Sequence, residues 1–290
     1  MTAAARPVSS LRQARHALSG GFVRKRPRRW ATMLAIGALG GLLVTLLRPS
    51  LLAPHSAEVI DLSHMLAAPS LHYPLGTDGF GRCVLSRVIY GARPSIAGAL
   101  VVAFGSMAIA LAVAVASTAR ARVVNTVARR LTDAALSLPT LVVAIATVGI
   151  LGAGTAPAVV ALCTTMWAGP SRIFTVLVLG ERASAHVEAA RSMGASPWWM
   201  LRTHLLPAVA SRMLVVGSQL VVSALLTLSG LSVLGLGPQP PSPEWGAMLN
   251  EARQWFYASP WLIVAPGAAI AMVAVTVTTL SDRIVSRLGR

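Results

Sequence analysis

Six apolar runs dominate this 290-residue chain, and they constrain its fold more than any other feature. A helix that crosses a bilayer needs about 17–25 such residues. The runs that reach this length cover residues 31–47, 95–116, 134–151, 156–174, 213–236 and 261–280. Hydrophobic residues make up 55% of the chain, which leaves no room for a sizeable soluble domain. We therefore predict an all-α membrane protein with six transmembrane helices.

The first run admits a second interpretation. Residues 24–29 are basic and the apolar part is short, as in a secretory signal peptide. We favour a transmembrane helix because no convincing small-residue cleavage site follows it. In addition, Gly37 and Gly41 form a GxxxG pair that suits helix packing.

The net charge of +16 is distributed unevenly between alternate loops. Basic residues gather before the first run, around residues 120–130, between the fourth and fifth runs, and after the sixth. The other loops hold only Arg48, Arg82, Arg87, Arg93 and Arg253. Cytoplasmic loops of membrane proteins carry such an excess of Lys and Arg. The pattern therefore predicts that both termini are cytoplasmic, and it explains the charge without a nucleic-acid partner.

This topology divides the chain into three parts. Residues 1–30 form a basic cytoplasmic arm that faces the head groups of the lipid bilayer. Residues 31–282 form the transmembrane domain, with outer loops at 48–93 and 237–260. Residues 283–290 form a cytoplasmic tail.

Several kinds of chemistry find no support in the sequence. Lys25 is the only lysine and no GxxxxGK[ST] precedes it, so the chain lacks a phosphate-binding loop. No motif of a metalloprotease or serine hydrolase occurs, and we predict that the chain is not an enzyme. His55, His64 and His72 have spacings without helical or hairpin logic, so we interpret them as scattered loop residues and predict no metal site. Acidic residues are missing from the middle of all six runs, which argues against a proton-driven transporter.

The most informative polar segment lies between the fourth and fifth runs and reads EAARSMGASPWWMLRTHLLP, residues 188–207. A helix is expected to stop at Gly194, because glycine adopts the left-handed cap freely. Ser196 then fits an N-cap and Pro197 the first position of a second helix, while Pro207 discourages its continuation. Two short helices joined at Gly194 form a compact knob that could occupy another protein's groove. The alternative is an ordinary connecting loop.

Two outer segments carry further signals. Residues 75–96 read LGTDGFGRCVLSRVIYGARPSI, in which glycines permit tight turns and Arg82, Arg87 and Arg93 could pair with Asp78 or with acids of a partner. A loop folded only by its own turns is the alternative. From residue 231 the chain reads LSVLGLGPQPPSPEWGAML, where four prolines stiffen the path. Trp245 and Trp255 suit a membrane interface, so this segment could also be an interfacial anchor helix.

Together these segments resemble the permeases of bacterial ABC importers, and within them the C-type subunit of the dipeptide, oligopeptide and nickel permease family. The resemblance runs from about residue 31 to 282. It implies a type I importer permease fold, with cytoplasmic coupling helices in an EAA loop at 181–212. The coupling residues it implies are Glu188, Ala189, Ala190, Gly194, His204 and Pro207. The residues it implies at the translocation path and substrate entrance are Arg172, Pro240, Pro241 and Trp245. The residues that match the structural motif are Gly76, Thr77, Asp78, Gly81, Arg82, Tyr90, Gly91 and Arg93.

The resemblance also implies partners and a mechanism. These are a second permease subunit, two ABC ATPase chains that bind ATP and Mg²⁺, and an extracytoplasmic substrate-binding protein, at a bacterial cytoplasmic membrane. This chain would hold no cofactor itself. ATP-driven alternating access would import di- or oligopeptides. A nickel or haem importer of the same family, or a membrane anchor that transports nothing, remains the alternative.

The sequence departs from the family pattern at three positions. Cys83 stands where an acidic residue is usual, Thr175 replaces an expected arginine, and Leu228 replaces a common acidic residue. These departures remove charges outside the EAA loop. For Arg172, which follows a Gly-Pro pair, we expect a side chain that reaches the cytoplasmic surface near the end of a span, with a position lining the gate as the alternative.

Overall fold

The computed structural model describes residues 29–119 and 121–288, and this part of the chain is helical. Its only strand-like pairing is an isolated antiparallel bridge between Thr77 and Cys83. The predicted basic arm lies outside the described residues except for its last two. The helices are α2 (Arg29–Leu47), η1 (Pro49–Leu51), η2 (Leu62–His64), α3 (Val84–Ser117), α4 (Arg122–Ser137), α5 (Thr140–Leu151), α6 (Thr155–Thr165), α7 (Ala168–Arg182), α8 (Ala185–Ser192), α9 (Pro197–Met200), η3 (Leu201–Leu205), α10 (Leu206–Val233), α11 (Trp245–Ala252), η4 (Arg253–Trp255) and α12 (Trp261–Leu288).

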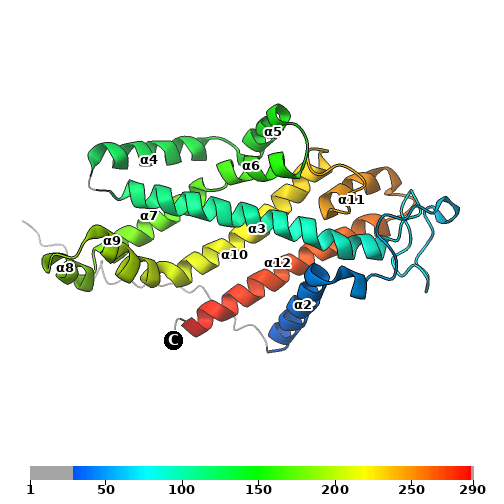
Figure 1. Ribbon diagram of the computed structural model, residues 1–290, viewed down its shortest axis with the longest axis horizontal. Coiled ribbons are helices and arrows are strands. Elements are labelled where there is room, and N and C mark those ends of the chain that lie inside the picture. Colours follow the sequence, from blue (N-terminus) through cyan, green and yellow to red (C-terminus); the bar gives the residue numbers. More distant parts are fainter. Residues whose placement is uncertain (1–28, 120, 289–290) are drawn as a thin grey trace, which may run out of the picture.

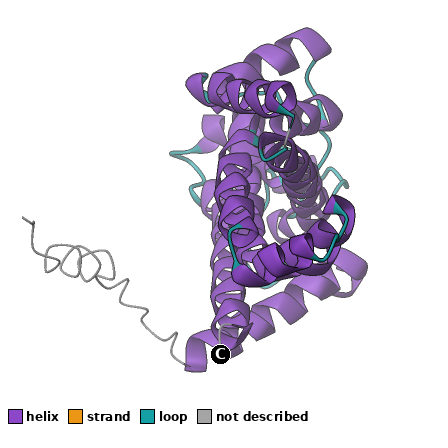
Figure 2. Cartoon of the chain, turned by 90° about the vertical axis from the view of Figure 1, so that its left-hand side faces the viewer, coloured by secondary structure: helices purple, strands orange, loops and turns teal. Residues whose placement is uncertain are grey.

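Long helices lie side by side and form the body of the molecule. Helix α3 packs against α7 and α10, and α10 packs against α12, with α2 along the other side of α12. Figure 2, turned by 90°, shows the body of the molecule as helices connected by loops. The two ends of the body differ, because α8 and α9 lie at one end while α11 and the loop before α3 lie at the other.

Small apolar side chains allow the helices to approach one another closely. The main core joins Ala99 and Val102 of α3 to Ala161 and Leu162 of α6 and to Leu225 of α10, all at most 1% exposed. Many larger apolar side chains instead remain on the outside of the bundle, as expected where lipid or another apolar helix covers them. Sequence periodicity alone could not distinguish the apolar side chains of the core from those that face outward.

Among the described residues, four continuous segments are long and apolar enough to cross a membrane. They are Val84–Ser117, Thr155–Arg182, Arg212–Val233 and Trp261–Ile284. They contain the second, fourth and sixth predicted runs and all but the last three residues of the fifth. The segment Thr155–Arg182 extends beyond the predicted fourth run and contains a turn at residues 166–167, between α6 and α7. Helix α12 continues to Leu288, so it includes most of the predicted tail.

The third predicted run differs from a straight span, whereas the first lies in a single helix. The third run, 134–151, is broken near its start: its first four residues end α4 and most of the rest forms α5, and the two helices meet at 90°. The break occurs because Pro139 cannot continue α4 and forces Leu138 into an extended conformation. The first run lies in helix α2, which has 19 residues. The apolar part of α2 within the described residues is Ile36–Leu47. The described residues thus contain four candidate spans, a fifth if the bent pair is counted, and the apolar part of α2.

Candidate functional site

The predicted helix-turn-helix is present at one end of the bundle, and we call residues 184–205 the knob. Helix α8 ends before Gly194, which has a φ of +84°. The N–H of Ala195 then donates to the carbonyl of Ala190 at 3.1 Å, as in a glycine-terminated helix. The hydroxyl of Ser196 accepts from the N–H of Trp199 at 3.2 Å, which confirms the predicted N-cap of the second helix.

The predicted stop at Pro207 is wrong. Helix α9 passes through a π-helical turn, Leu201–Leu205, directly into α10. In this wide turn the N–H of Leu206 donates to the carbonyl of Leu201, so the hydrogen-bond pattern shifts by one residue just before the proline. Pro207 lies in the first turn of α10, where its missing N–H costs little. The second half of the knob is therefore continuous with a long helix of the bundle.

The outer surface of the knob carries both charged and apolar side chains. Glu188, Arg191, Met193 and Trp198 are exposed, the last two at 82% and 70%. Ala189 is exposed beside them, whereas Ala190 is buried and packs inward. Exposed large apolar residues in a cluster mark a surface that binds a partner.

A small aromatic cluster connects the knob to helix α7. The ring of His204, which is half-buried, lies 5.1 Å from Trp199 and 5.6 Å from His186, measured between ring centroids. His186 Nε2 in turn lies 3.1 Å from Glu181 Oε1 at the end of α7. The sequence predicted a role for His204 but missed His186 and Glu181, because no motif links residues on three separate helices.

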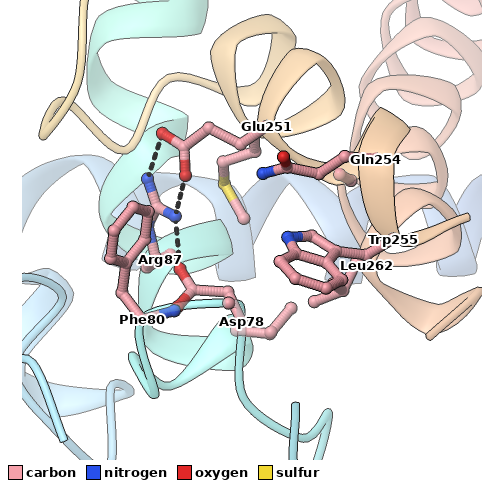
Figure 3. Close-up of a pocket in the computed structure, with 11 residues that line it drawn as sticks. Asp78, Phe80, Arg87, Glu251, Gln254, Trp255 and Leu262 are labelled. Carbon is pink, nitrogen blue, oxygen red and sulfur yellow. Dashed lines mark hydrogen bonds and ion pairs between the residues drawn. The ribbon is translucent and has the colours of Figure 1, made fainter. Parts of the chain in front are cut away.

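A buried ion network occupies the opposite end of the bundle (Figure 3). Asp78 Oδ2 accepts from Arg82 Nε at 2.7 Å and from Arg87 Nη1 at 2.6 Å. Glu251 Oε2 accepts from Arg82 Nη2 at 2.6 Å and from Arg87 Nη1 at 2.7 Å. Arg82 and Arg87 are 3% and 1% exposed. The predicted pairing with Asp78 is confirmed, and the second carboxylate comes from α11.

Arg93 takes a different role from the one expected for it. It is exposed, and its guanidinium donates to the carbonyls of Leu46 and Leu47 at 2.6 and 2.7 Å. These are carbonyls at the end of α2 that no residue within the helix can pair. Arg93 therefore fixes α2 to α3 and does not pair with Asp78. Tyr90, one turn earlier in α3, is half-buried.

The loop before α3, residues 48–83, folds on itself, and we call it the cap. Thr77 is fully buried, accepts from the N–H of Ala67 at 2.8 Å and donates to the carbonyl of His64. Gly81 has a φ of +73°, and a Cβ there would lie 1.7 Å from the carbonyl oxygen of Asp61. The two sequence alternatives, a self-folded loop and an ion-paired loop, are thus both present. Gly76 provides a second tight turn, with φ +71°.

Helix α11 and the Pro-rich loop before it are held against α3 by hydrogen bonds. Glu244 caps α11 by accepting from the N–H groups of Gly246 and Ala247, and it also accepts from Ser95 Oγ at 3.0 Å. Trp245 is only 2% exposed and donates to the carbonyl of Val88 at 2.8 Å, so it does not occupy the interfacial position that its residue type suggested.

The backbone of the Pro-rich loop closely approaches helix α3. A Cβ at Gly91 would lie 2.0 Å from the carbonyl oxygen of Pro243. Only a glycine at this position leaves room for the contact. Pro240 and Pro241 remain exposed beyond it, so the loop is held at its base and presents its prolines at the surface.

The remaining predicted positions are dispersed over the bundle. Arg172 is exposed in the first half of α7, well before the helix end, because α7 continues beyond the predicted run. Cys83 is a buried free thiol directly before α3. Thr175 Oγ1 donates to the carbonyl of Ser171 at 2.8 Å, and Leu228 packs against the main core.

The three histidines of the cap are not scattered, contrary to our interpretation of the sequence. Their rings surround Tyr73, with centroid distances of 5.0 Å for His55, 5.7 Å for His64 and 4.7 Å for His72. Hydrogen bonds from Ser63 and then from His64 lower the pKa of Asp61 beside them. Among the described residues, no three His, Cys, Asp or Glu side chains are arranged to hold a metal ion. The turns of the cap bring these residues together, and no sequence spacing predicts that.

Comparison with known proteins identifies the arrangement. The family described as "Binding-protein-dependent transport system inner membrane component" matches residues 106–290. This chain belongs to that family. The permease is 34% identical to a glutathione transport system permease protein, GsiD, of Pectobacterium atrosepticum, over 80% of this chain and 77% of that protein. It is 32% identical to the metal-staphylopine import system permease protein CntC of Staphylococcus aureus, over 77% of each chain.

The fold of the permease is also found in a solved structure. An inward-facing form of the MetNI methionine ABC transporter has a chain that matches 70% of this permease and 97% of its own length, with a TM-score of 0.60 and 19% identity. The expected type I ABC importer permease fold is therefore confirmed. The resemblance to the peptide and nickel branch is confirmed by the two relatives, which both belong to it.

Proposed function

We propose that the permease is one of two membrane subunits of an ATP-driven importer for di- or small oligopeptides. The observation that carries the proposal is the knob, whose left-handed Gly194 sets the angle between two helices and whose exposed face suits a partner's groove. The continuity of α9 with α10 supports it, because movement of the knob is then transmitted to a long helix.

Two partner ATPase chains would supply the energy, and ATP and Mg²⁺ would bind there. Closing of the ATPase pair moves the knobs, and the knobs swing the spans so that the cavity opens outward. Shifting such an equilibrium from 1:99 to 99:1 takes about 5.5 kcal/mol of differential stabilisation. A second permease subunit completes the path and an extracytoplasmic binding protein delivers the substrate.

Small peptides are the substrate class that we propose first. One relative carries the name of a glutathione permease, and glutathione is a small peptide. A second candidate is a complex of a metal ion with an organic chelator, which the name of the staphylopine relative favours. Uptake of labelled dipeptide, glutathione and nickel–chelator complex by the reconstituted importer distinguishes these classes. If ATP is hydrolysed by the complex but none of them is imported, the chain is a membrane anchor and not a transporter subunit.

We expect both termini and the knob to be cytoplasmic and the cap to face outward. A test uses a permease in which Cys83 and Cys163 are replaced by Ala and a single Cys is placed at Ser196 or Leu71, both of which are exposed. In sealed cells, a membrane-impermeant maleimide should label the cysteine at position 71 and should reach position 196 only after permeabilisation. Labelling of position 196 in sealed cells contradicts this topology.

The exposed prolines of the loop at 237–244 are expected to help dock the binding protein. Replacing Pro240 and Pro241 with Gly frees the loop in the undocked state, which costs about 0.4–1 kcal/mol per position on docking. The two positions together correspond to a rise of about four- to thirtyfold in the concentration of binding protein needed for half-maximal uptake. Complex assembly should be unchanged. Pro54→Gly, at an exposed proline of the cap, serves as the control. An unchanged concentration dependence counts against a docking role for this loop.

A further inference from the structure

Arg172 lies deep in the candidate span Thr155–Arg182, in the first half of α7 (Figure 1). It precedes Arg182, where that span ends, by ten residues, or about 15 Å along the helix. Arg182 donates a hydrogen bond to the carbonyl of Thr118, so this span and α3 end at the same level. The hydrocarbon core of a bilayer is about 30 Å thick. With Arg182 at the membrane surface, Arg172 lies near the middle of that core, too deep for its side chain to reach the surface.

The guanidinium of Arg172 has no partner among the described residues. The side chain is exposed and makes no hydrogen bond or ion pair with any of them. Glu181, the one acid of its span, pairs with His186 instead. Asp133 lies on α4, which packs against α7, but makes no ion pair with Arg172 either. An unpaired charge at this depth is costly against lipid, and charges inside membranes therefore face water-filled cavities or protein. The face of α7 that carries Arg172 is thus not a lipid face.

The helix face around Arg172 leaves room for a small ligand. Gly169, one turn before, and Gly180, two turns after, both face open space, since a Cβ at either position would meet no atom within 4 Å. Val176, one turn after Arg172, is 65% exposed. The hydroxyl of Thr175 is used within the helix, where it donates to a backbone carbonyl of α7. Arg172 therefore supplies the free hydrogen-bond donors of this open face.

We propose that Arg172 binds the free carboxylate of a peptide during its passage through the membrane, which makes the importer selective for peptides with an unblocked C-terminus. A guanidinium offers two parallel N–H donors, and these match the two oxygens of a carboxylate. The attraction is stronger where water is scarce. A C-terminal amide has one neutral oxygen and gains no such ion pair. This inference rests on the proposed peptide-import function and identifies a specificity-determining residue for it.

The test compares two probes, alanyl-alanine and its C-terminal amide, in proteoliposomes that hold the complete importer. The maximal uptake rate is measured with an excess of binding protein saturated with each probe, so that delivery to the permease does not limit the comparison. In the wild type, the free dipeptide should be imported about tenfold faster than the amide. Arg172→Gln should bring this ratio to about one, and Arg172→Lys, which keeps the charge but not the planar fork, should give an intermediate ratio. Arg253→Gln, at an exposed arginine outside the candidate spans, is the control and should keep the wild-type ratio.

The outcomes separate this inference from the proposed function. If Arg172→Gln keeps the wild-type ratio while the free dipeptide is still imported, the inference is overturned and the importer stands. Co-purification of the second permease subunit is measured on the same samples. Loss of that subunit from Arg172→Gln would show that one of its acids, and not the substrate, pairs with Arg172, and this would also overturn the inference. If the wild-type complex hydrolyses ATP but imports neither probe, the proposed function fails and this inference fails with it.

Discussion

Peptide uptake by a Gly194→Val permease is expected to fall about five- to thirtyfold while the protein still inserts into the membrane. Gly194 has a φ of +84°, and holding an L-residue there costs about 1–2 kcal/mol, which corresponds to that factor. A Cβ at Gly194 would meet no atom within 4 Å, so the effect comes from the backbone and not from a clash. The measurement is uptake together with stimulation of ATP hydrolysis by the loaded binding protein.

Two further variants sharpen this test. Gly194→Asn should lose much less activity, because asparagine tolerates the left-handed conformation. Gly180→Val is the matched control, since Gly180 lies within α7 and a Cβ there also meets open space. Normal uptake and normal stimulation in Gly194→Val would show that the knob only connects two helices, and the proposed importer would then lack its coupling element.

Removing the carboxylate of Glu251 is expected to destabilise the permease by about 3 kcal/mol. Glu251→Ala leaves Arg82 and Arg87 with Asp78 as their only anionic partner, and breaking a buried ion pair costs about 3–5 kcal/mol. The lower end applies because the Glu251 side chain is 18% exposed. The unfolding midpoint of the purified permease in nanodiscs measures the effect.

A double-mutant cycle isolates the interaction from the loss of the side chain. The double variant Glu251→Met/Arg87→Met should lose less stability than the sum of the losses in the two single variants. Each single variant leaves one buried charge without a partner, whereas the double variant removes both charges. Glu58→Ala, at an exposed acid of the cap, is the control and should change stability by less than about 0.5 kcal/mol. If Glu251→Ala has the same midpoint as the wild type, the network does not hold α11 to the cap.

The sequence predicted those features whose causes are local. Gly194, Ser196 and Pro197 carry the knob's turn and cap within a few residues, so their pattern could be interpreted without a structure. The same holds for Asp78 and Arg82, which lie four residues apart in the cap. Glu251 was missed because it meets Arg87 only when α11 folds back onto α3, and no local pattern encodes that contact.

Other features depended on competition between local preference and packing. Pro207 has the local signature of a stop, but the wide turn before it lets the helix continue into the bundle. Pro139 lies inside an apolar run that looks continuous, and there the local preference prevailed and broke the span. The histidines around Tyr73 are assembled by the turns of the cap, so their spacing contained no signal.

Helices α9, η3 and α10 are continuous, so a rotation of the second half of the knob also rotates α10. Helix α10 has 28 residues and so measures about 42 Å. Rotation of such a stiff rod by about 10° displaces its far end by about 7 Å. At that end Gly246 of α11 packs against the backbone of Ser229, where a Cβ would lie 2.7 Å from its Cα, and α11 carries Glu251 to the cap. A movement of the knob would therefore produce a larger displacement at the ion network that joins α11 to the cap, at the opposite end of the bundle.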